Sequence, residues 1–171
     1  MTPTKRELRT VSLEATVVVR SINFLTWRES NLPPLPSRVK IVVVGHDYCL
    51  FKERLAYLIA ESKVRIQERH IDVVGYQTVA DAMPVFKNKE VVLVILLKSV
   101  LNEWDEISFI NRSGLIVYGQ GKAFASRGLC LCSNDENNRL RMSINRRKLE
   151  AVGVEIDNRL VLLNPTLYFY N

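Results

Sequence analysis

VKIVVVGHDYCLFKERLAYLIAES, residues 39–62, holds a buried strand and an amphipathic helix joined by a short turn. The opening run, VKIVVV, has the length and β-branched composition of a strand inside a sheet. Beyond Gly45, apolar residues recur at the spacing of a helix with one buried face. The inward positions are Leu50, Leu55, Leu58 and Ile59. A strand followed at once by such a helix is typical of a parallel α/β sheet.

The same alternation continues downstream. The predicted strands are IDVVGY (71–76), EVVLVILL (90–97) and LIVYG (115–119). Residues 78–88 are predicted to form a helix with a Thr78 cap and Asp81 three residues on, as in a capping box. A further helix is predicted from a Ser99 cap to a stop at Gly114. This order predicts a parallel sheet with helices on its faces.

Upstream, residues 13–27 are predicted to form the first helix. Their apolar residues recur at helical spacing, whereas the β-branched run at 17–19 favours a strand; we prefer the helix. The proline-rich stretch NLPPLPSR (31–38) is expected to be an extended linker inside the domain. We expect one domain over residues 1–171, with a flexible N-terminus (1–12) and a C-terminal tail (165–171).

After Gly119 the pattern changes. LCLCS and RLRMSI are strand-like runs joined by the polar turn NDENN, which predicts an antiparallel hairpin at the edge of the sheet. Asn145 then caps a short helix, RRKLEAV, that ends at Gly153, and VEIDNRLVLL (154–163) is a final alternating run. The predicted fold class is therefore α/β: a mixed, mainly parallel sheet flanked by helices, with a C-terminal antiparallel hairpin and a short helix.

Composition limits the classes of function. The 171 residues are 47% hydrophobic and carry a formal charge of +6, a mild excess that scattered surface charge or an anionic partner would explain. Aromatic residues are not interleaved with a dense basic stripe, so we expect no nucleic-acid partner. The longest apolar run, 91–97, is too short to span a membrane. The first ten residues lack the apolar core of a signal peptide, so the chain as written is not expected to be exported.

The sequence offers no arrangement of residues for catalysis. Residues 40–59 look like the start of a phosphoacceptor receiver domain, which needs carboxylates after its first strand and an aspartate after its third. Asp47 is a single candidate at the first position, and the third strand ends at Lys98. His46 and His70 have no metal-ligand spacing. We therefore expect a non-enzymatic protein with no catalytic residue, no cofactor and no metal.

Two short segments are candidate sites for an anion. The first is the turn after the 115–119 strand, with Gly119, Gly121 and Lys122, whose backbone amides could hold a phosphate; a tight turn with no ligand is the alternative. The second is the pair Arg146 and Arg147, at the positive end of their helix, where an anion would offset an unfavourable charge. Two solvated arginines are the alternative there.

Three cysteines are present, and one is left over if any pair forms. Cys130 and Cys132 are two residues apart, so on a strand both would face the same side, and a bridge between them would be strained. Buried thiols are the first interpretation. A redox pair, or a bridge from Cys49 to one of the other two, is the alternative.

The segment GQGKAFASRGLCLCSNDENNRLRMSINRRKLEAVGVEIDNRLVLL (119–163) resembles the C-terminal signature of the YfiR-like (DUF4154) family. That signature has a glycine-rich turn, a hairpin ending in Ile-Asn, a short helix ending in Gly and paired leucines. The matching residues are Gly119, Gly121, Phe124, Gly128, Ile144, Asn145, Ala151, Gly153, Leu162 and Leu163. SINFLTWRE (21–29) and KIVVVGHD (40–47) resemble the family's first helix and first strand, so the resemblance spans about residues 13–163.

The resemblance implies an α/β, often dimeric, non-enzymatic regulator in the periplasm. The best known member restrains an inner-membrane diguanylate cyclase and so lowers cyclic di-GMP and biofilm formation. By resemblance, the partner would be a membrane-anchored signalling protein, contacted by a protein that does not span the membrane. Two alternatives stay open: a structural component of a cell-envelope assembly, and a module that binds a small anionic ligand. A cytoplasmic location is the alternative to the periplasm.

Overall fold

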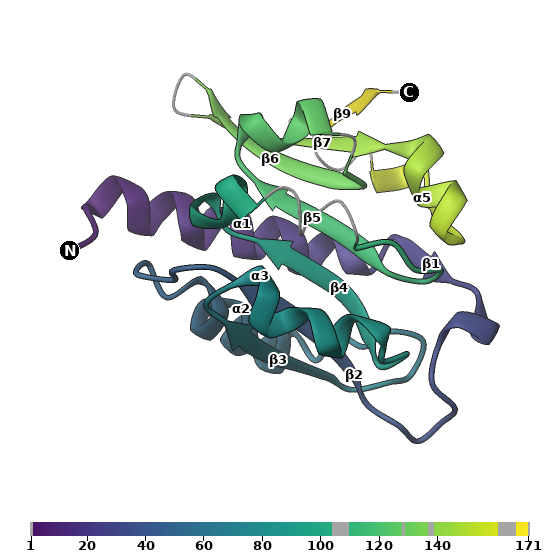
Figure 1. Cartoon of the computed structure of the whole chain (residues 1–171). Coiled ribbons are helices and arrows are strands. Elements are labelled where there is room, and N and C mark those ends of the chain that lie inside the picture. The colour runs from purple at the N-terminus through teal and green to yellow at the C-terminus, as the bar shows by residue number, and fades with distance from the viewer. Residues whose placement is uncertain (1, 104–109, 128, 137–138, 161–166, 171) are drawn as a thin grey trace.

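The computed structural model describes residues 2–103, 110–127, 129–136, 139–160 and 167–170 (Figure 1). The strands are β1 (Leu25–Trp27), β2 (Val39–Val44), β3 (Ile71–Tyr76), β4 (Val91–Leu96), β5 (Ile116–Gln120), β6 (Leu131–Glu136), β7 (Arg139–Asn145), β8 (Val154–Ile156) and β9 (Leu167–Tyr170). The α-helices are α1 (Lys5–Ile22), α2 (Phe51–Ser62), α3 (Val79–Ala82) and α5 (Arg146–Val152). Short 3-10 helices are η1 (Glu29–Asn31), η2 (Met83–Lys87), η3 (Lys98–Glu103) and η4 (Lys122–Arg127).

The main sheet is mixed and mainly parallel, as the sequence predicts. Its strand order is β3-β2-β4-β5-β6-β7-β9 among the described residues. The strands from β3 to β6 run parallel, and β7 turns back antiparallel to β6 as the predicted hairpin. The prediction that this hairpin forms the edge of the sheet is wrong. Strand β9 pairs with β7 in parallel and is the edge strand on that side among the described residues. All of β9 comes from residues 165–171, which were expected to be a tail.

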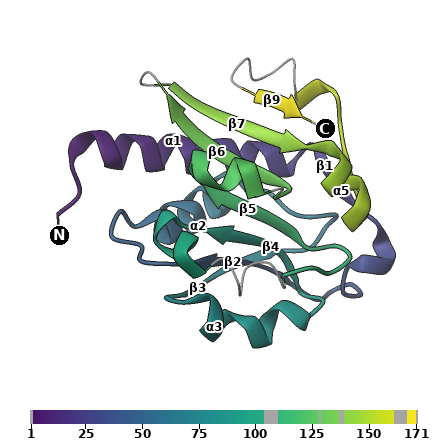
Figure 2. The same ribbon diagram turned by 45° about the horizontal axis from the view of Figure 1, so that its top comes forward.

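Two layers of helices cover the sheet (Figures 1 and 2). α1 and α2 pack on one face, in a core that also takes in α5. α3, η2 and η4 pack on the other face. Every residue of β4 is buried, since this strand has helices over both faces and strands on both sides. The position of this strand explains its unbroken apolar sequence.

The first helix begins earlier than predicted. Thr4 and Glu7 form a capping box, in which each side chain accepts a hydrogen bond from the other residue's backbone N–H, so α1 starts at Lys5 instead of residue 13. Residues 5–12, expected to belong to a flexible N-terminus, are therefore part of the helix. The β-branched run 17–19 is helical, because its valines pack α1 onto the sheet. The chain becomes strand β1 at Leu25.

Helix α2 begins at Phe51. The Asp47 carboxylate accepts hydrogen bonds from the Phe51 and Lys52 amides at 2.7 and 2.8 Å, which satisfies two free N–H groups of the first turn. The prediction that Leu50 faces the core is wrong: it has φ of 58° and is 59% exposed. Phe51 takes the buried position, and Leu55 and Ile59 are buried as predicted.

The helix predicted at 78–88 forms as two pieces. Thr78 caps α3, where its side chain accepts from the Asp81 amide at 3.1 Å, and a 3-10 turn, η2, continues to Lys87. The helix predicted from Ser99 to Gly114 is observed only as the 3-10 segment η3 in its first residues. Residues 104–109 lie outside the described part of the chain, and Trp104 is among them.

The C-terminal caps are confirmed. Asn145 accepts from the Lys148 amide at 3.1 Å, and α5 ends at Gly153 with φ of 80°. The final alternating run is a strand only at β8, which pairs antiparallel with β1 in a second, two-stranded sheet. Leu162 and Leu163 lie outside the described residues.

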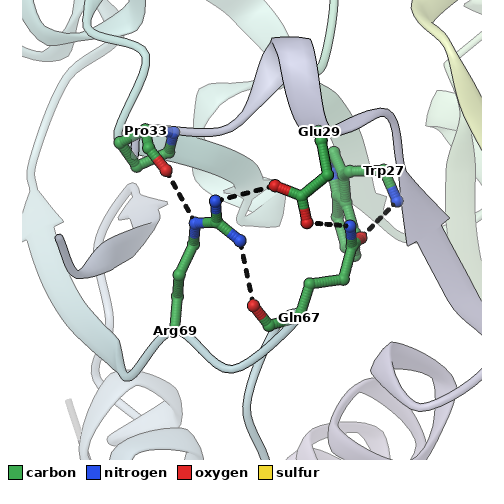
Figure 3. Close-up of polar contacts among 5 residues, drawn as sticks. All are labelled: Trp27, Glu29, Pro33, Gln67 and Arg69. Atoms are coloured by element: carbon green, nitrogen blue, oxygen red, sulfur yellow. Dashed lines mark hydrogen bonds and ion pairs between the residues drawn. The ribbon is translucent and has the colours of Figure 1, made fainter. Parts of the chain in front are cut away.

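A buried arginine ties the linker to the rest of the domain (Figure 3). The Arg69 guanidinium, 2% exposed, donates to the Pro33 and Gln67 carbonyls and to the Glu29 carboxylate at 2.7, 2.9 and 2.9 Å. The Gln67 side chain accepts from the Trp27 amide at 2.7 Å and donates to Glu29 at 3.1 Å. These contacts join strand β1 and the proline-rich segment to the turn before β3.

Candidate functional site

A cavity of about 200 Å³ lies at the carboxyl ends of β2, β4 and β5, beside the N-terminal half of α1. From β2 the chain moves outward to β3 and then returns across β2 to β4, so the strand order reverses between β2 and β4. Open α/β sheets bind ligands beyond the carboxyl ends of their strands at such a reversal. The apolar lining includes Val11, Phe51, Leu97 and Leu140.

The turns after β2 and β4 are held close together at the cavity. The His46 amide donates to the Ser99 hydroxyl at 2.8 Å. Gly45 makes this approach possible: it has φ of 132°, and a Cβ there would lie 2.7 Å from the Ser99 oxygen. A side chain at position 45 would push the two turns apart.

Glu14, on α1, forms the polar floor of the cavity. Its carboxylate accepts from the Ser133 hydroxyl of β6 at 3.1 Å and from the Gln120 amide of β5 at 3.3 Å. The Tyr118 ring lies beside it, fully buried, and its hydroxyl has no hydrogen-bond partner of ordinary geometry among the described residues. One carboxyl group therefore fixes α1 to two neighbouring strands.

Burial changes the acidity of this floor. Loss of water raises the pKa of Glu14 to about 7, although its hydrogen bonds act in the opposite direction. The pKa of Tyr118 is raised well above its ordinary value, first by burial and then by the neighbouring Glu14 charge. Glu14 therefore changes between its neutral and charged forms near neutral pH, whereas Tyr118 keeps its proton.

A hydrogen bond joins two segments of the cavity near the start of α1. The Tyr48 hydroxyl donates to Glu7 at 2.9 Å, which joins α1 to the turn after β2. Hydrogen bonds from Thr4 and Tyr48 lower the pKa of Glu7, and the bond to Glu7, together with partial burial, raises the pKa of Tyr48 to about 12. Both groups therefore stay in the forms that keep this bond at neutral pH.

Lys98, in the turn after β4, supplies a cation at the cavity. Its side chain is exposed and passes beside Gly121, where a Cβ would lie 3.4 Å from the lysine Cε. Its backbone amide donates to the Gln120 side chain at 3.2 Å, so the floor also positions this residue. Within the described ranges, no carboxylate lies within ion-pair distance of its ammonium group, but Glu7 and Glu14 are close enough for its positive charge to act against a higher pKa at both.

The structure separates the two segments predicted to bind an anion. Gly121 lines the cavity, but its amide already donates to Ser133, and Gly119 is packed against Phe124. Lys122 is exposed at the start of η4. Arg146 and Arg147 follow β7, which runs opposite to β5, so they lie toward the other end of the sheet. Arg146 donates to the Asn158 side chain at 3.2 Å.

The three thiols form no disulfide with one another, and they lie apart. Cys130 precedes β6 and packs in the core under α1, whereas Cys132 lies in the core on the opposite face. The prediction that both face one side is wrong, because Cys130 precedes the regular part of the strand. Cys49 is half-buried and lines the cavity, and burial raises its pKa, which disfavours the reactive thiolate.

Sequence reasoning missed the residues that build the floor: Glu14, Tyr118, Gln120 and Ser133. One signal was available, since Glu14 falls on the buried face of α1, beside Val11, Ala15 and Val18. A carboxylate at such a position needs partners or a raised pKa. Its partners come from residues more than a hundred positions away, and no local pattern identifies them.

A comparison of the sequence with protein-family models identifies one family. The family model described as YfiR/HmsC-like (DUF4154) matches residues 11–164. The chain belongs to the YfiR/HmsC-like family. The match includes Glu14, the parallel strands and the capped helix α5, and membership supports a regulatory role in broad terms. Among curated proteins, none matches the chain.

Two solved structures have a similar fold. One is a conserved domain protein from Vibrio cholerae O1 biovar El Tor, at 12% identity and a TM-score of 0.57, over 92% of this chain and 60% of that one. The other is an ABC domain from Streptococcus pneumoniae in complex with L-Trp, at 9% identity and a TM-score of 0.59, over 87% and 58%. The chain thus spans less than two thirds of either protein, and at these identities the likeness shows the fold.

Proposed function

We propose that this protein is a non-enzymatic regulator of the YfiR type, which restrains a membrane-anchored diguanylate cyclase by direct contact in the periplasm. The observation that carries the proposal is the family match over residues 11–164. Its partner would hold the membrane anchor. No helix in the described part of the chain is long and apolar enough to span a bilayer.

Two segments that line the cavity also carry exposed apolar side chains, which offer a surface for such a contact. Leu8 on α1 and Leu50 before α2 are 44% and 59% exposed, and both belong to the segments that the Tyr48–Glu7 bond joins. Large apolar side chains that are exposed to water are candidates for contact with a protein partner. Leu35, in the proline-rich linker, is 51% exposed and serves as a matched control away from the cavity.

The experiment is a deletion with complementation in the native host. Deleting the gene should raise cellular cyclic di-GMP, and the wild-type chain should lower it again. The double variant Leu8→Glu, Leu50→Asn should fold but fail to restore the low level, whereas Leu35→Asn should restore it. Asn is used because it tolerates the left-handed backbone at position 50.

An unchanged cyclic di-GMP level after deletion would contradict the proposal. Recovery of the chain as a stoichiometric part of a large envelope complex, with no effect on cyclic di-GMP, would instead support a structural role. Export is measured in the same strain, as the fraction of the protein that is recovered with the periplasmic contents after the outer membrane is opened.

A further inference from the structure

We infer that the cavity at the carboxyl ends of β2, β4 and β5 is a binding site for a small molecule with one carboxylate and a short apolar body. The inference concerns binding by the chain alone, so it stands or falls independently of any protein partner. It depends on which polar groups of the cavity are already used and which are left for a ligand.

The acidic groups of the cavity are used within the protein. Both oxygens of Asp47 accept backbone amides of α2. Both oxygens of Glu7 accept, one from the Thr4 amide and one from the Tyr48 hydroxyl. Both oxygens of Glu14 accept from β5 and β6. A cationic ligand would therefore have to compete with internal donors at each of these carboxylates.

The group left for a ligand is a donor. Lys98 carries three N–H bonds on an exposed ammonium group, and none of the ion pairs seen among the described residues uses it. The cavity therefore offers an ammonium group that makes no close ion pair among the described residues, although its charge acts at longer range on Glu7 and Glu14. A carboxylate is the simplest ligand group that would complete it, by a charge-assisted hydrogen bond.

The rest of the cavity fits an apolar body. Val11, Phe51, Leu97 and Leu140 line it, and burying apolar surface against such side chains favours binding. Its volume of about 200 Å³ exceeds several times the roughly 30 Å³ that a water molecule occupies in the liquid. A carboxylate with a chain of several carbons is therefore of suitable size.

Three probes with the same six-carbon chain separate the alternatives: hexanoate, hexanol and hexylammonium. Each is titrated into ¹⁵N-labelled full-length chain, and amide chemical shifts are followed. Hexanoate should bind saturably at millimolar concentration or below, with shifts gathered at residues 6–14, 46–51, 97–99 and 120–121. Hexanol should bind at least about tenfold more weakly, because it lacks the charged contact.

Two variants and one control complete the test. Lys98→Met should remove the preference for hexanoate over hexanol, whereas Lys87→Met, at an exposed lysine on the opposite face of the sheet, should leave it unchanged. Val11→Phe should fill the cavity and abolish binding of both probes. Circular dichroism checks that each variant is folded.

Four results would overturn the inference: no saturable shifts with hexanoate, equal or tighter binding of hexylammonium, unchanged binding by Lys98→Met, or shifts that map away from the cavity. The cyclic di-GMP experiment is unaffected by any of them, so failure of ligand binding and failure of the regulatory role are distinguishable.

Discussion

At the scale of single residues, Glu14 is the most informative side chain of this protein. It is 2% exposed, yet it carries an ionisable group that is held by two strands of the sheet. An acid whose pKa is higher in the folded than in the unfolded chain binds its proton more tightly when folded. Its contribution to the free energy of unfolding therefore decreases as the pH rises between the two pKa values.

We expect Glu14→Gln to change the pH dependence of stability. In the wild type, ionising Glu14 between pH 4.5 and about 7 should lower the free energy of unfolding by up to about 3 kcal/mol. The glutamine cannot ionise, so the variant should be the more stable protein above pH 7 and should lose this slope. Urea unfolding of both proteins across this pH range measures the difference.

Other carboxyl groups change the free energy of unfolding with pH in the opposite direction to Glu14, and they serve as an internal control. Hydrogen bonds lower the pKa of Glu7, Glu29, Asp72 and Asp157, so the stability they add is present above their ordinary values and is lost on acidification. Subtracting the Glu14→Gln curve from the wild-type curve cancels these effects. A difference that is flat with pH would show that Glu14 has no raised pKa.

At the scale of elements, the chain uses single polar side chains to hold segments that lack a long run of regular structure. Strand β1 and the segment 31–38 contribute few backbone hydrogen bonds to the sheets. Arg69 compensates by bonding two carbonyls and a carboxylate from three segments. The turn before β3 is thereby held against β1.

We expect Arg69→Met to destabilise the fold by about 2–3 kcal/mol, because it leaves the buried Pro33 carbonyl and the part-buried Gln67 carbonyl without their donor. Glu29→Gln should cost much less, since the Glu29 side chain is 68% exposed and the glutamine can still accept from Arg69. Chemical denaturation of the two variants gives the comparison. Equal losses would mean that the ion pair, and not the buried carbonyls, carries the stabilisation.

At the scale of the whole molecule, the central strands of the sheet are buried, whereas the two edge strands have fewer neighbours. β4 is buried along its length, whereas β3 and β9 each have one strand neighbour among the described residues. Amides at the centre exchange only when large parts of the protein unfold, and those at edges exchange through local opening.

We therefore expect hydrogen exchange to be slowest in β4 and β2 and faster in β3, and β9 should exchange faster than β7, which lies inside it. Mass spectrometry of peptides over a time course measures this order. Equal protection of β3 and β4 would indicate that another chain covers the β3 edge in solution.

The local structure of this protein follows from short stretches of its amino-acid sequence. The α/β alternation, the hairpin and the caps at Thr78 and Asn145 were predictable because strand periodicity and capping depend on residues a few positions apart. Reasoning from local spacing also gave the wrong prediction that Leu50 is buried. Spacing cannot show that the Asp47 carboxylate accepts from the Phe51 amide, so that α2 begins at Phe51 and Leu50 stays outside the helix.

The candidate site, in contrast, depends on how distant elements pack against one another. Glu14 meets Ser133 because α1 packs on the sheet with its N-terminal half at the carboxyl ends of strands that lie far away in the sequence. Lys98 meets Gly121 because β4 and β5 are parallel neighbours. The pairing of β1 with β8 and of β7 with β9 likewise joins distant segments. Contacts of this kind depend on how whole elements pack, and a periodic pattern within one element carries no information about which distant element lies opposite it.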